Sequence, residues 1–448
     1  MTREAQLRQA ILDDPEDVSL RLIYADALLE RGDNRGEHIA LACGQDTESD
    51  DAELRRRALW QQHGDRWARD DLGYVMRRDR PIYRYGLPYA ASINGNEPPP
   101  WLQRTPLASL AITRSEGAGR YATTQVIRRI RGLAIRDSFP DTTGAEALLA
   151  AAPHLRRFSL GEERWGRHGA GIWRVLESYE RIGELEELEL AAIPITAERA
   201  QWLGAHLRNI KRLTIRADLD RASLLALAEH VPSLEELSLT NTHYGETIGL
   251  TEALSGPWAR NLTRLRVSNP ERGLGGVIAK LGGLVELALA NHHRPEVVDE
   301  LAGCTFPLLE KLDLSNNNLR ADHQLIAPKL RSLQIAFNPM RPHAMTDLHE
   351  LDARSTHLTD DDFAALASRP IRRLDVLATR ITDRSIDTAL TMPELRELTI
   401  GFMSSDELRR LAAGFPKMER LEIDGYDGRT FSDDWLVLEP NIFERKLV

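Results

Sequence analysis

Three histidines are the side chains of this sequence best suited to hold a metal ion. His292 and His293 are adjacent, and His243 comes earlier in the chain. Imidazole nitrogens bind zinc at about 2.0–2.1 Å, so all three would have to converge on one point. In a repeat array, His243 would lie two repeats before the pair, and two strand spacings correspond to roughly 10 Å. We therefore interpret them as solvated loop residues and expect no metal.

Cysteine is the other residue type that could carry chemistry, as a nucleophile. Cys43 and Cys304 are too few to staple a small secreted domain, so we expect free thiols. Cysteine-based ubiquitin ligases carry an aspartate two residues after the cysteine, whereas Gln45 and Phe306 stand there in this sequence. No phosphate-binding loop, Rossmann pattern, nucleophile elbow or zinc-binding helix motif occurs. We expect neither an enzyme nor a cofactor, and keep an enzyme with an unrecognised site as an alternative.

The composition limits the classes of partner. Over 448 residues, 58 Lys and Arg stand against 68 Asp and Glu, which gives a net charge of −10 at pH 7. This balance opposes the basic footprint that nucleic-acid binding requires. No apolar run approaches the length of about 18 residues that crosses a bilayer, and the start does not resemble a secretory signal. We expect a cytoplasmic protein that binds neither nucleic acid nor membrane.

A short hydrophobic pattern, L-x-x-L-x-L with occasional substitutions, returns through most of the chain. Its fourteen copies start on average about 24 residues apart, a period typical of a repeat array. Leucines three apart also suit an amphipathic helix, but the last step of two residues favours a short strand. The copies begin at Leu107, Ile130, Leu155, Leu185, Ile210, Leu234, Leu262, Leu284, Leu309, Leu330, Leu348, Ile371, Leu395 and Met418.

These copies resemble the leucine-rich-repeat family. The copy LEKLDLSNNNL, which begins at Leu309, matches the family pattern L-x-x-L-x-L-x-x-N-x-L with Asn317 in the asparagine position. In the family, that side chain bonds to backbone groups of the loop that leaves the strand. Asn338, Thr356 and Thr379 occupy the same position in the next copies. The resemblance implies an α/β leucine-rich-repeat solenoid, with a curved parallel sheet and helices on its convex side.

Between the copies, the sequence turns helical. The stretch LTDDDFAALASRPIRRL, from Leu358, has an apolar stripe after Thr359 and Asp360, whose side-chain oxygens can cap the helix start. Similar starts occur at Thr196 and Thr382. A proline then stops the helix before the next strand. The prolines in this place are Pro153, Pro232, Pro307, Pro370, Pro393 and Pro416.

Side chains at the third, fifth and seventh positions of each copy should point away from the leucine core, toward the concave surface. Third positions alternate in charge, as in Arg157 and Glu187, so opposite charges should lie side by side on adjacent strands. Fifth positions become acidic toward the C-terminal half, which indicates either a solvated face or a surface for a basic partner. The candidate partner-binding residues on this surface are Arg216, Ser238, Thr240, Arg266, Asp313, Gln334, Asp352, Arg354 and Asp375.

Residues 1–44 predict helices separated by turns. They resemble the short repeat-companion domain found ahead of repeat arrays in certain bacteria. The matching blocks are Asp14-Pro15, Arg21-Leu22, Tyr24-Ala25-Asp26, Glu30-Arg31-Gly32-Asp33 and Arg35-Gly36-Glu37. The resemblance implies bacterial origin and pairing with repeats, and brings no defined activity. The polar residues that could suggest catalysis are Tyr24, Asp26, Arg31, Asp33 and Arg35. Their spacing around a helix end better suits capping and ion pairing.

Four parts are expected along the chain. Residues 1–44 form the helical repeat-companion domain, and 45–105 form a connecting region and N-terminal cap, with an opening strand in YRYGLPYAASI from Tyr83. Residues 106–430 form the array of about fourteen repeats. Residues 431–448 form a C-terminal cap that shields the last core layer from water.

The sequence predicts a monomeric protein-interaction scaffold. Its concave face suits binding of another protein, because many strands present side chains at fixed spacing and little loop ordering opposes binding. An alternative is a regulator or secreted effector whose N-terminal domain recruits a second component. Neither the identity of the partner nor the pathway follows from the sequence.

Overall fold

The structure is a computed structural model of the chain. It divides into two units, Met1–Pro194 with Ala205–Ala217 and Leu447–Val448, and Ile195–Gly204 with Asp218–Lys446. The residues that it describes are 2–44, 50–73, 81–94, 97–113, 117–136, 142–161, 169–217, 219–231, 233–240, 249–290, 296–319, 326–339, 347–401, 410–411, 413–414, 418–423, 435–439 and 442–445.

Helices open the first unit: α1 (Arg3–Asp13), α2 (Val18–Leu29), α3 (Asn34–Cys43) and α4 (Asp50–Leu72). Asp17 and Asp33 cap α2 and α3, each carboxylate accepting backbone N–H groups of the first turn. Gly32, with a φ of 75°, adopts the left-handed conformation that ends the preceding helix. A buried core joins the first three helices to the following strand through Ile11, Tyr24, Ala25, Leu28, Ile39 and Leu87.

Polar residues of the N-terminal segment link these helices to one another. Arg31 pairs with Glu4 of α1. Arg35 donates to both carboxylate oxygens of Asp71 in α4, at 3.1 and 2.5 Å, and both side chains are buried. Together with the cap at Asp33, these contacts agree with the predicted capping and ion pairing.

The first sheet starts with a hairpin. β1 (Ile82–Arg84) and β2 (Leu87–Ile93) are antiparallel, so the prediction of a single opening strand from Tyr83 was wrong. Tyr85 and Gly86, with φ of 53° and 70°, turn the chain between the two strands, because two left-handed residues match the twist of a tight hairpin. β2 then begins a parallel series that continues through β3 (Ser109–Ile112), β4 (Gly132–Ile135), β5 (Arg157–Gly161), β6 (Glu187–Ala191) and β7 (Arg212–Arg216).

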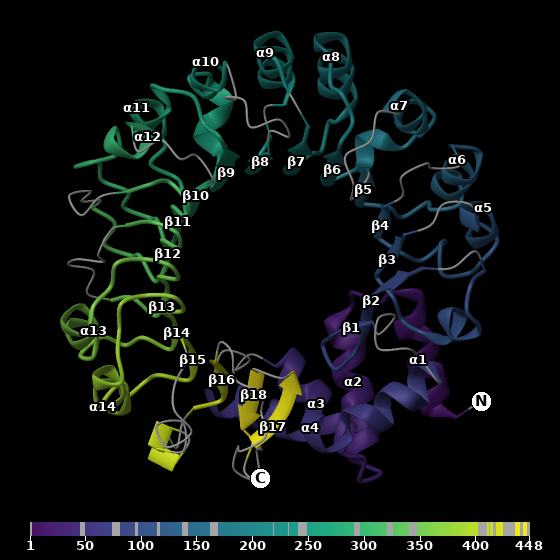
Figure 1. The fold of residues 1–448 in the computed structure, drawn as a ribbon. Helices are drawn as coiled ribbons and strands as arrows, with labels where there is room; N and C mark the ends of the chain where they lie inside the picture. Colours follow the sequence, from purple (N-terminus) through teal and green to yellow (C-terminus); the bar gives the residue numbers. More distant parts are fainter. Residues whose placement is uncertain are drawn as a thin grey trace. The chain divides into compact units, whose positions relative to one another are not determined.

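The second unit contains the longer parallel series. Its strands are β8 (Glu236–Leu239), β9 (Arg264–Ser268), β10 (Glu286–Ala290), β11 (Lys311–Asp313), β12 (Ser332–Gln334), β13 (Glu350–Asp352), β14 (Arg373–Asp375), β15 (Glu397–Ile400) and β16 (Arg420–Ile423). β17 (Trp435–Glu439) and β18 (Ile442–Arg445) form a hairpin, and β18 pairs antiparallel with β16. Figure 1 shows the strands of this unit on the inner side of its curve.

Each strand from β3 to β16 begins at the third residue of a predicted copy, which confirms the register of the repeat. One line of leucines shows the result: Leu312, Leu333 and Leu351 pair in succession and are at most 2% exposed. Burial of such a side chain stabilises the fold by roughly 1.5–3 kcal/mol. The chain has an α/β leucine-rich-repeat solenoid fold, preceded by a helical region.

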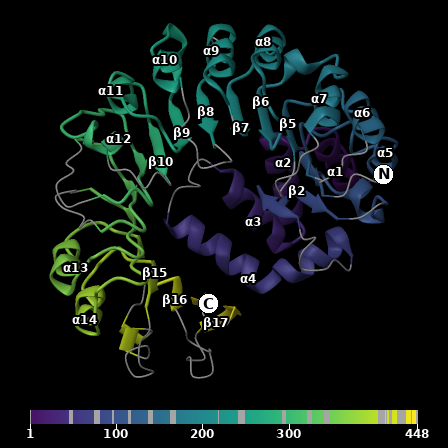
Figure 2. The same ribbon diagram turned by 45° about the horizontal axis from the view of Figure 1, so that its top comes forward.

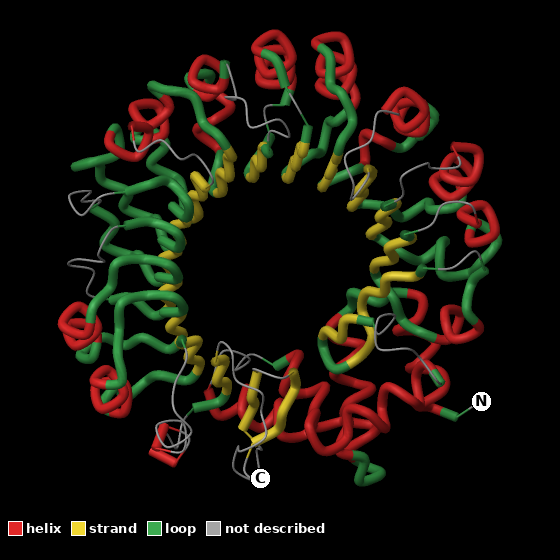
Figure 3. Tube along the Cα trace, in the orientation of Figure 1, coloured by secondary structure: helices red, strands yellow, loops and turns green. Residues whose placement is uncertain are grey.

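Helices cover the outer side of the strands within each unit (Figure 3). In the first unit they are α5 (Ala118–Tyr121), α6 (Thr142–Ala150) and α7 (Gly169–Glu177). α8 (Ala197–His206) follows β6. In the second unit they are α9 (Arg221–His230), α10 (Leu250–Leu254), α11 (Leu274–Ile278), α12 (Glu296–Asp299), α13 (Asp360–Leu366) and α14 (Arg384–Leu390). Figure 2 shows α9 and α10 side by side. Pro232 and Pro416 of the predicted series lie outside the described residues.

The predicted asparagine ladder is present. Asn338 is fully buried; its Nδ2 donates to the carbonyl oxygens of Leu314 and Ile335 at 2.9 and 2.8 Å, and its Oδ1 accepts from the Asn317 N–H at 2.9 Å. Thr356 and Thr379 make a shorter version, each donating its hydroxyl at 2.8 Å to a carbonyl three residues earlier. These side chains satisfy the backbone where the chain leaves each strand.

Among the described residues, the eighth position of six copies adopts the left-handed conformation, which was not predicted from the sequence. There the backbone N–H donates to the neighbouring strand, as from Asn316 to Ala336 O and from Phe337 to Arg354 O, both at 2.8 Å. The six residues, with φ of 52–59°, are Ala192, Asn269, Asn316, Phe337, Ser355 and Ala378. Asparagine suits this conformation better than the others do, and phenylalanine suits it poorly.

Acidic side chains link the outer helices of adjacent repeats. Thr359 caps α13 in a capping box with Asp362, as its position predicts. Asp360 does not share that cap: its carboxylate accepts from the N–H and hydroxyl of Thr382 and from the Ser385 hydroxyl, at 2.6–2.8 Å, and so holds α14. The expectation for Asp360 was wrong because Thr359 alone serves α13 and the next helix start lies within reach.

Candidate protein-binding surface

The inner face of the second unit carries the side chains that alternate with the buried leucines. Third-position residues form the predicted row of alternating charge. Arg373 pairs with Glu350 at 3.5 Å and with Glu397 at 3.1 Å, and Arg264 pairs with Glu286 at 3.7 Å. Exposed pairs of this kind contribute about 0–1 kcal/mol each. The row therefore holds neighbouring strands in register, and its charges are already matched.

The fifth positions form a second row, which contains six of the predicted site residues, and four of these lie on the successive strands β11 to β14. Asp313 pairs in register with Gln334, Gln334 with Asp352, and Asp352 with Asp375. Thr399 and Glu422 continue the row on β15 and β16. Adjacent strands are about 4.8 Å apart, so these side chains are immediate neighbours. We call Asp313, Gln334, Asp352, Asp375 and Glu422 the acidic row.

The aspartates of the acidic row also shape the loops that follow the strands. Each Oδ1 accepts a backbone N–H two residues later: Asp313 from Ser315, Asp352 from Arg354 and Asp375 from Leu377, at 3.0–3.2 Å. This is an Asx turn, and the signal that would have revealed it is Asp at the end of a strand with a turn behind it. In Asp352 and Asp375, the other carboxylate oxygen contacts the guanidinium of Arg354.

Arg354, at a seventh position, connects two of these carboxylates. Its guanidinium donates to both oxygens of Asp352, at 3.1 and 2.7 Å, and lies 3.2 Å from an oxygen of Asp375. The pKa of Asp375 is raised to about 6 by burial and by the carboxylates of Asp352 and Glu422, against the opposing effects of the Leu377 N–H and Arg354. The half-buried carboxylates of Asp352 and Asp375 are thus both contacted by the guanidinium of Arg354.

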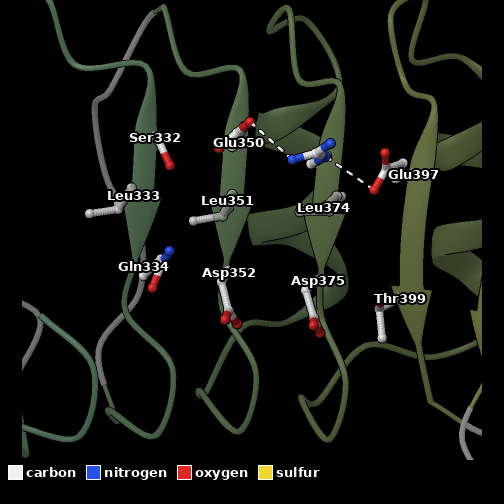
Figure 4. A pocket seen from close by; sticks show the side chains of 11 residues that line it. Ser332, Leu333, Gln334, Glu350, Leu351, Asp352, Leu374, Asp375, Glu397 and Thr399 are labelled. Carbon is white, nitrogen blue, oxygen red and sulfur yellow. Dashed lines mark hydrogen bonds and ion pairs between the residues drawn. The ribbon is translucent and has the colours of Figure 1, made fainter. Parts of the chain in front are cut away.

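A shallow hollow of about 250 Å³ lies over this part of the sheet (Figure 4). In Figure 4, Asp352 and Asp375 point the same way from neighbouring strands, with Gln334 and Thr399 on either side. The ion pairs of Glu350, Arg373 and Glu397 border the hollow on its other side. The acidic row is therefore open along an edge of this concavity.

Phe337 was not predicted as part of the site. It follows β12, it is 57% exposed, and its left-handed φ of 59° is unusual for an aromatic residue. Its N–H donates to the carbonyl of Arg354, so its backbone borders the acidic row. An exposed aromatic residue in a strained conformation is a signal of function that only coordinates provide.

The other predicted site residues lie elsewhere. Ser238 and Arg266 pair in register on β8 and β9, and Thr240 follows β8. Arg266 is 3.4 Å from Glu286, so its charge is partly matched. Arg216 ends β7 in the first unit, where it pairs with Glu189 at 2.9 Å. Gln334, Asp352 and Asp375 line the hollow. Asp313 is the in-register neighbour of Gln334, and Arg354 contacts both Asp352 and Asp375. The other four predicted residues, Arg216, Ser238, Thr240 and Arg266, do not line it.

The candidates for chemistry can be placed in part. His243, His292 and His293 lie outside the described residues. Among the residues that are described, no group of three His, Cys, Asp or Glu side chains could hold a metal ion. Cys43 and Cys304 are free thiols, and burial raises the pKa of Cys43 to about 11, which disfavours the reactive thiolate. No helix within the described ranges is both long and apolar enough to span a bilayer.

Comparison with known proteins gives likenesses of fold only. No family model and no curated protein matches the chain. Among solved structures, it is similar to Toll in the Drosophila Toll–Spätzle complex, with 15% identity, a TM-score of 0.39 and coverage of 75% of this chain and 50% of that one. It is also similar to a chain of the yeast Rad7–Elc1 complex, with 14% identity, a TM-score of 0.41, and coverage of 74% of this chain and 78% of that one. A third similar structure is an internalin of Listeria monocytogenes, with 14% identity, a TM-score of 0.33, and coverage of 69% of this chain and 86% of that one. The chain thus spans half the length of the Toll chain that it matches, and values this low say nothing about what it binds.

Proposed function

We propose that this chain is a non-enzymatic, monomeric protein-interaction scaffold that binds its protein partner on the inner face of the second unit. The binding surface is the acidic row with Arg354, next to the hollow over β12 to β15. The partner presents an arginine or lysine side chain to Asp352 and Asp375. Strand residues suit this task because their spacing is set by the sheet, so little ordering opposes association.

The observation that carries the proposal is geometric: Asp352 and Asp375 lie side by side on β13 and β14, and both contact the guanidinium of Arg354. A carboxylate whose pKa is raised to about 6 is held in its charged form at neutral pH against the preference of its surroundings. A cation brought by a partner would relieve that cost, because it would stand beside the carboxylates that now share Arg354. The row of third-position residues on the same face offers no comparable gain, since Arg373 already pairs with Glu350 and Glu397.

The exposure and backbone conformation of Phe337 also support a binding surface at this position. Asn269 and Asn316 occupy the equivalent left-handed position of other copies with little strain, whereas Phe337 does not. Its exposed ring gives the partner an apolar contact beside the acidic row, and aromatic residues are frequent anchors of interfaces. The carboxylates of Asp352 and Asp375 and the strained backbone of Phe337 thus support the same binding surface.

The experiment is affinity capture from the native organism with three versions of the full chain. Asp352→Asn with Asp375→Asn removes both charges and keeps an oxygen that can accept the Asx-turn N–H. Glu229→Gln with Glu198→Gln removes two charges from helices α9 and α8 and serves as the control. We expect one protein to be retained by the wild type and the control and lost from the first variant. Retention of every captured protein by that variant would refute the assignment of the surface.

A further inference from the structure

Helix α1 is attached to the first unit by a small apolar contact and by a series of ion pairs. All residues of α1 are described, and Ile11 is the single buried one among them. Leu7 packs, partly buried, against the same core as Ile11. Ion pairs add Glu4 with Arg31, Arg3 with Glu30 at 3.7 Å, and Arg8 with Asp71 at 3.4 Å. Such contacts weaken as salt screens them, and an element with little buried surface opens at low cost.

The turn that follows α1 continues this series of charges. Asp13 lies 3.5 Å from Arg129, and Asp14 lies 3.4 Å from Arg131, both just before β4. Glu16 then reaches Arg157, the first residue of β5, at 2.7 Å. We call Asp13, Asp14 and Glu16 the acidic turn.

The carboxylate of Glu16 is received by three side chains of the sheet. Oε1 accepts from the Tyr89 hydroxyl at 2.6 Å and from Arg157 Nη2 at 2.7 Å, and Oε2 lies 3.4 Å from Arg131 Nε. Burial alone would raise the pKa of Glu16, but these donors and cations hold it below its ordinary value. Tyr89, Arg131 and Arg157 therefore form a carboxylate cradle.

The sheet leaves room for this cradle at Gly132. A Cβ on Gly132 would come within 2.7 Å of the Ser109 hydroxyl and 3.3 Å of Arg157 Nε. A side chain there would push Arg157 away, so glycine lets the guanidinium lie across β4 toward Tyr89. The ring of Tyr89 also has the guanidinium groups of Arg84 and Arg157 at 5.1 and 5.9 Å from its centre. The donors are thus held in place by the sheet and not by the acidic turn.

We propose that the carboxylate cradle is a second interaction site, for an acidic segment of a partner protein, which the chain's own acidic turn occupies in this structure. Release of α1 and the acidic turn uncovers a basic and aromatic surface on a protein of net charge −10. The group that the cradle holds in this structure is a carboxylate, whose Oε1 accepts from both the Tyr89 hydroxyl and one guanidinium nitrogen of Arg157. The acidic turn is then a built-in competitor of that partner.

The test uses a fluorescent hexaglutamate peptide as the probe, with binding followed by anisotropy at low salt. Asp14→Asn with Glu16→Gln opens the cradle. Asp26→Asn with Glu180→Gln makes the same change of charge at two exposed positions of the first unit and serves as the control. We expect the opened variant to bind the peptide at least about tenfold more tightly than the wild type and the control. Adding Arg157→Gln to the opened variant should abolish that gain.

Two further readouts keep the result unambiguous. Amide hydrogen exchange of α1 should be faster in the opened variant than in the wild type, while the exchange of β2 to β5 stays unchanged. A hexathymidylate should bind the opened variant more weakly than the peptide does. The proposal is overturned by equal peptide binding of the wild type and opened variants, by a gain that survives loss of Arg157, by unchanged exchange of α1, or by tighter binding of the oligonucleotide.

Discussion

Carboxylates meet guanidinium groups in two regions of this molecule, with opposite outcomes. In the first unit, Glu16 receives three donors, and its pKa is lowered. In the acidic row of the second unit, Asp352 and Asp375 share Arg354, and the pKa of Asp375 is raised to about 6. In both places the guanidinium lowers the pKa of the carboxyl. At Glu16 this effect outweighs burial, whereas at Asp375 burial and the neighbouring carboxylates outweigh it. The chain's own Glu16 occupies the carboxylate cradle, whereas we propose that a partner's cation binds at the acidic row.

The largest effect is expected from Leu312→Asp, which tests the register on which the acidic row depends. Leu312 is 2% exposed, and its neighbour Asp313 lies on the opposite face of the same strand. An unpaired carboxylate in the leucine layer should cost more than about 4 kcal/mol and unfold the neighbouring repeats. Thermal melting followed by circular dichroism measures it. Gln334→Asp, on the exposed face of β12, is the control, and an unaltered melting curve for Leu312→Asp would show the register to be wrong.

Asp375→Asn should stabilise the protein by about 1–2 kcal/mol at neutral pH. The folded-state pKa lies above the unfolded value, so the native state binds more protons between the two values and loses stability as pH rises through about 6. The gain should therefore shrink as pH falls below 6 and be absent near the ordinary pKa of aspartate. Urea unfolding across this range is the measurement. A loss of stability at neutral pH would contradict the strained state of this carboxylate.

Glu16→Gln should have the opposite sign and a smaller size, a loss of about 1 kcal/mol at neutral pH. Because the folded-state pKa is lowered, the contribution of the carboxylate is fully present above the unfolded value and disappears as pH falls through the folded value. The difference between wild type and variant, measured by urea unfolding, should close in acid. Identical pH profiles for Glu16→Gln and Asp375→Asn would remove the contrast between the two regions.

Phe337→Asn should give the smallest change, a gain of about 0.5–1 kcal/mol, because asparagine accepts the left-handed conformation more readily. The same substitution should weaken partner binding. Asn316→Ala, at the equivalent position of the preceding copy, should instead lower stability. The midpoint of thermal unfolding reports both, and destabilisation by Phe337→Asn would mean that the ring packs against the fold.

The repeat could be predicted from sequence because its signal is local and periodic. Leucines at fixed steps place each strand from β3 to β16, and register then makes Asp352 and Asp375 neighbours without further information. Asn317 and Asn338 followed from the family pattern. These features depend on residues close in sequence, or on a regular stack.

What could not be predicted depends on contacts without a period. Glu16 and Arg157 are 141 positions apart, and nothing in either segment names the other. The turn at Tyr85 and Gly86 lacks the Asn-Gly signature of its type, so one strand was expected where two occur. Asp360 has the spacing of a cap for its own helix but serves the next one. In the acidic row, the sequence predicted where the charges lie but not that Arg354 contacts both Asp352 and Asp375.

The most direct measurement is the pKa of the Asp375 carboxyl, from NMR of protein labelled with ¹³C at the aspartate carboxyls, with Asp375→Asn for assignment. We predict a value of about 6 for the protein alone, which falls by about one unit or more when a nona-arginine peptide is added. A value near that of an ordinary aspartate, or one that the peptide leaves unchanged, would contradict the claim that this surface awaits a basic partner.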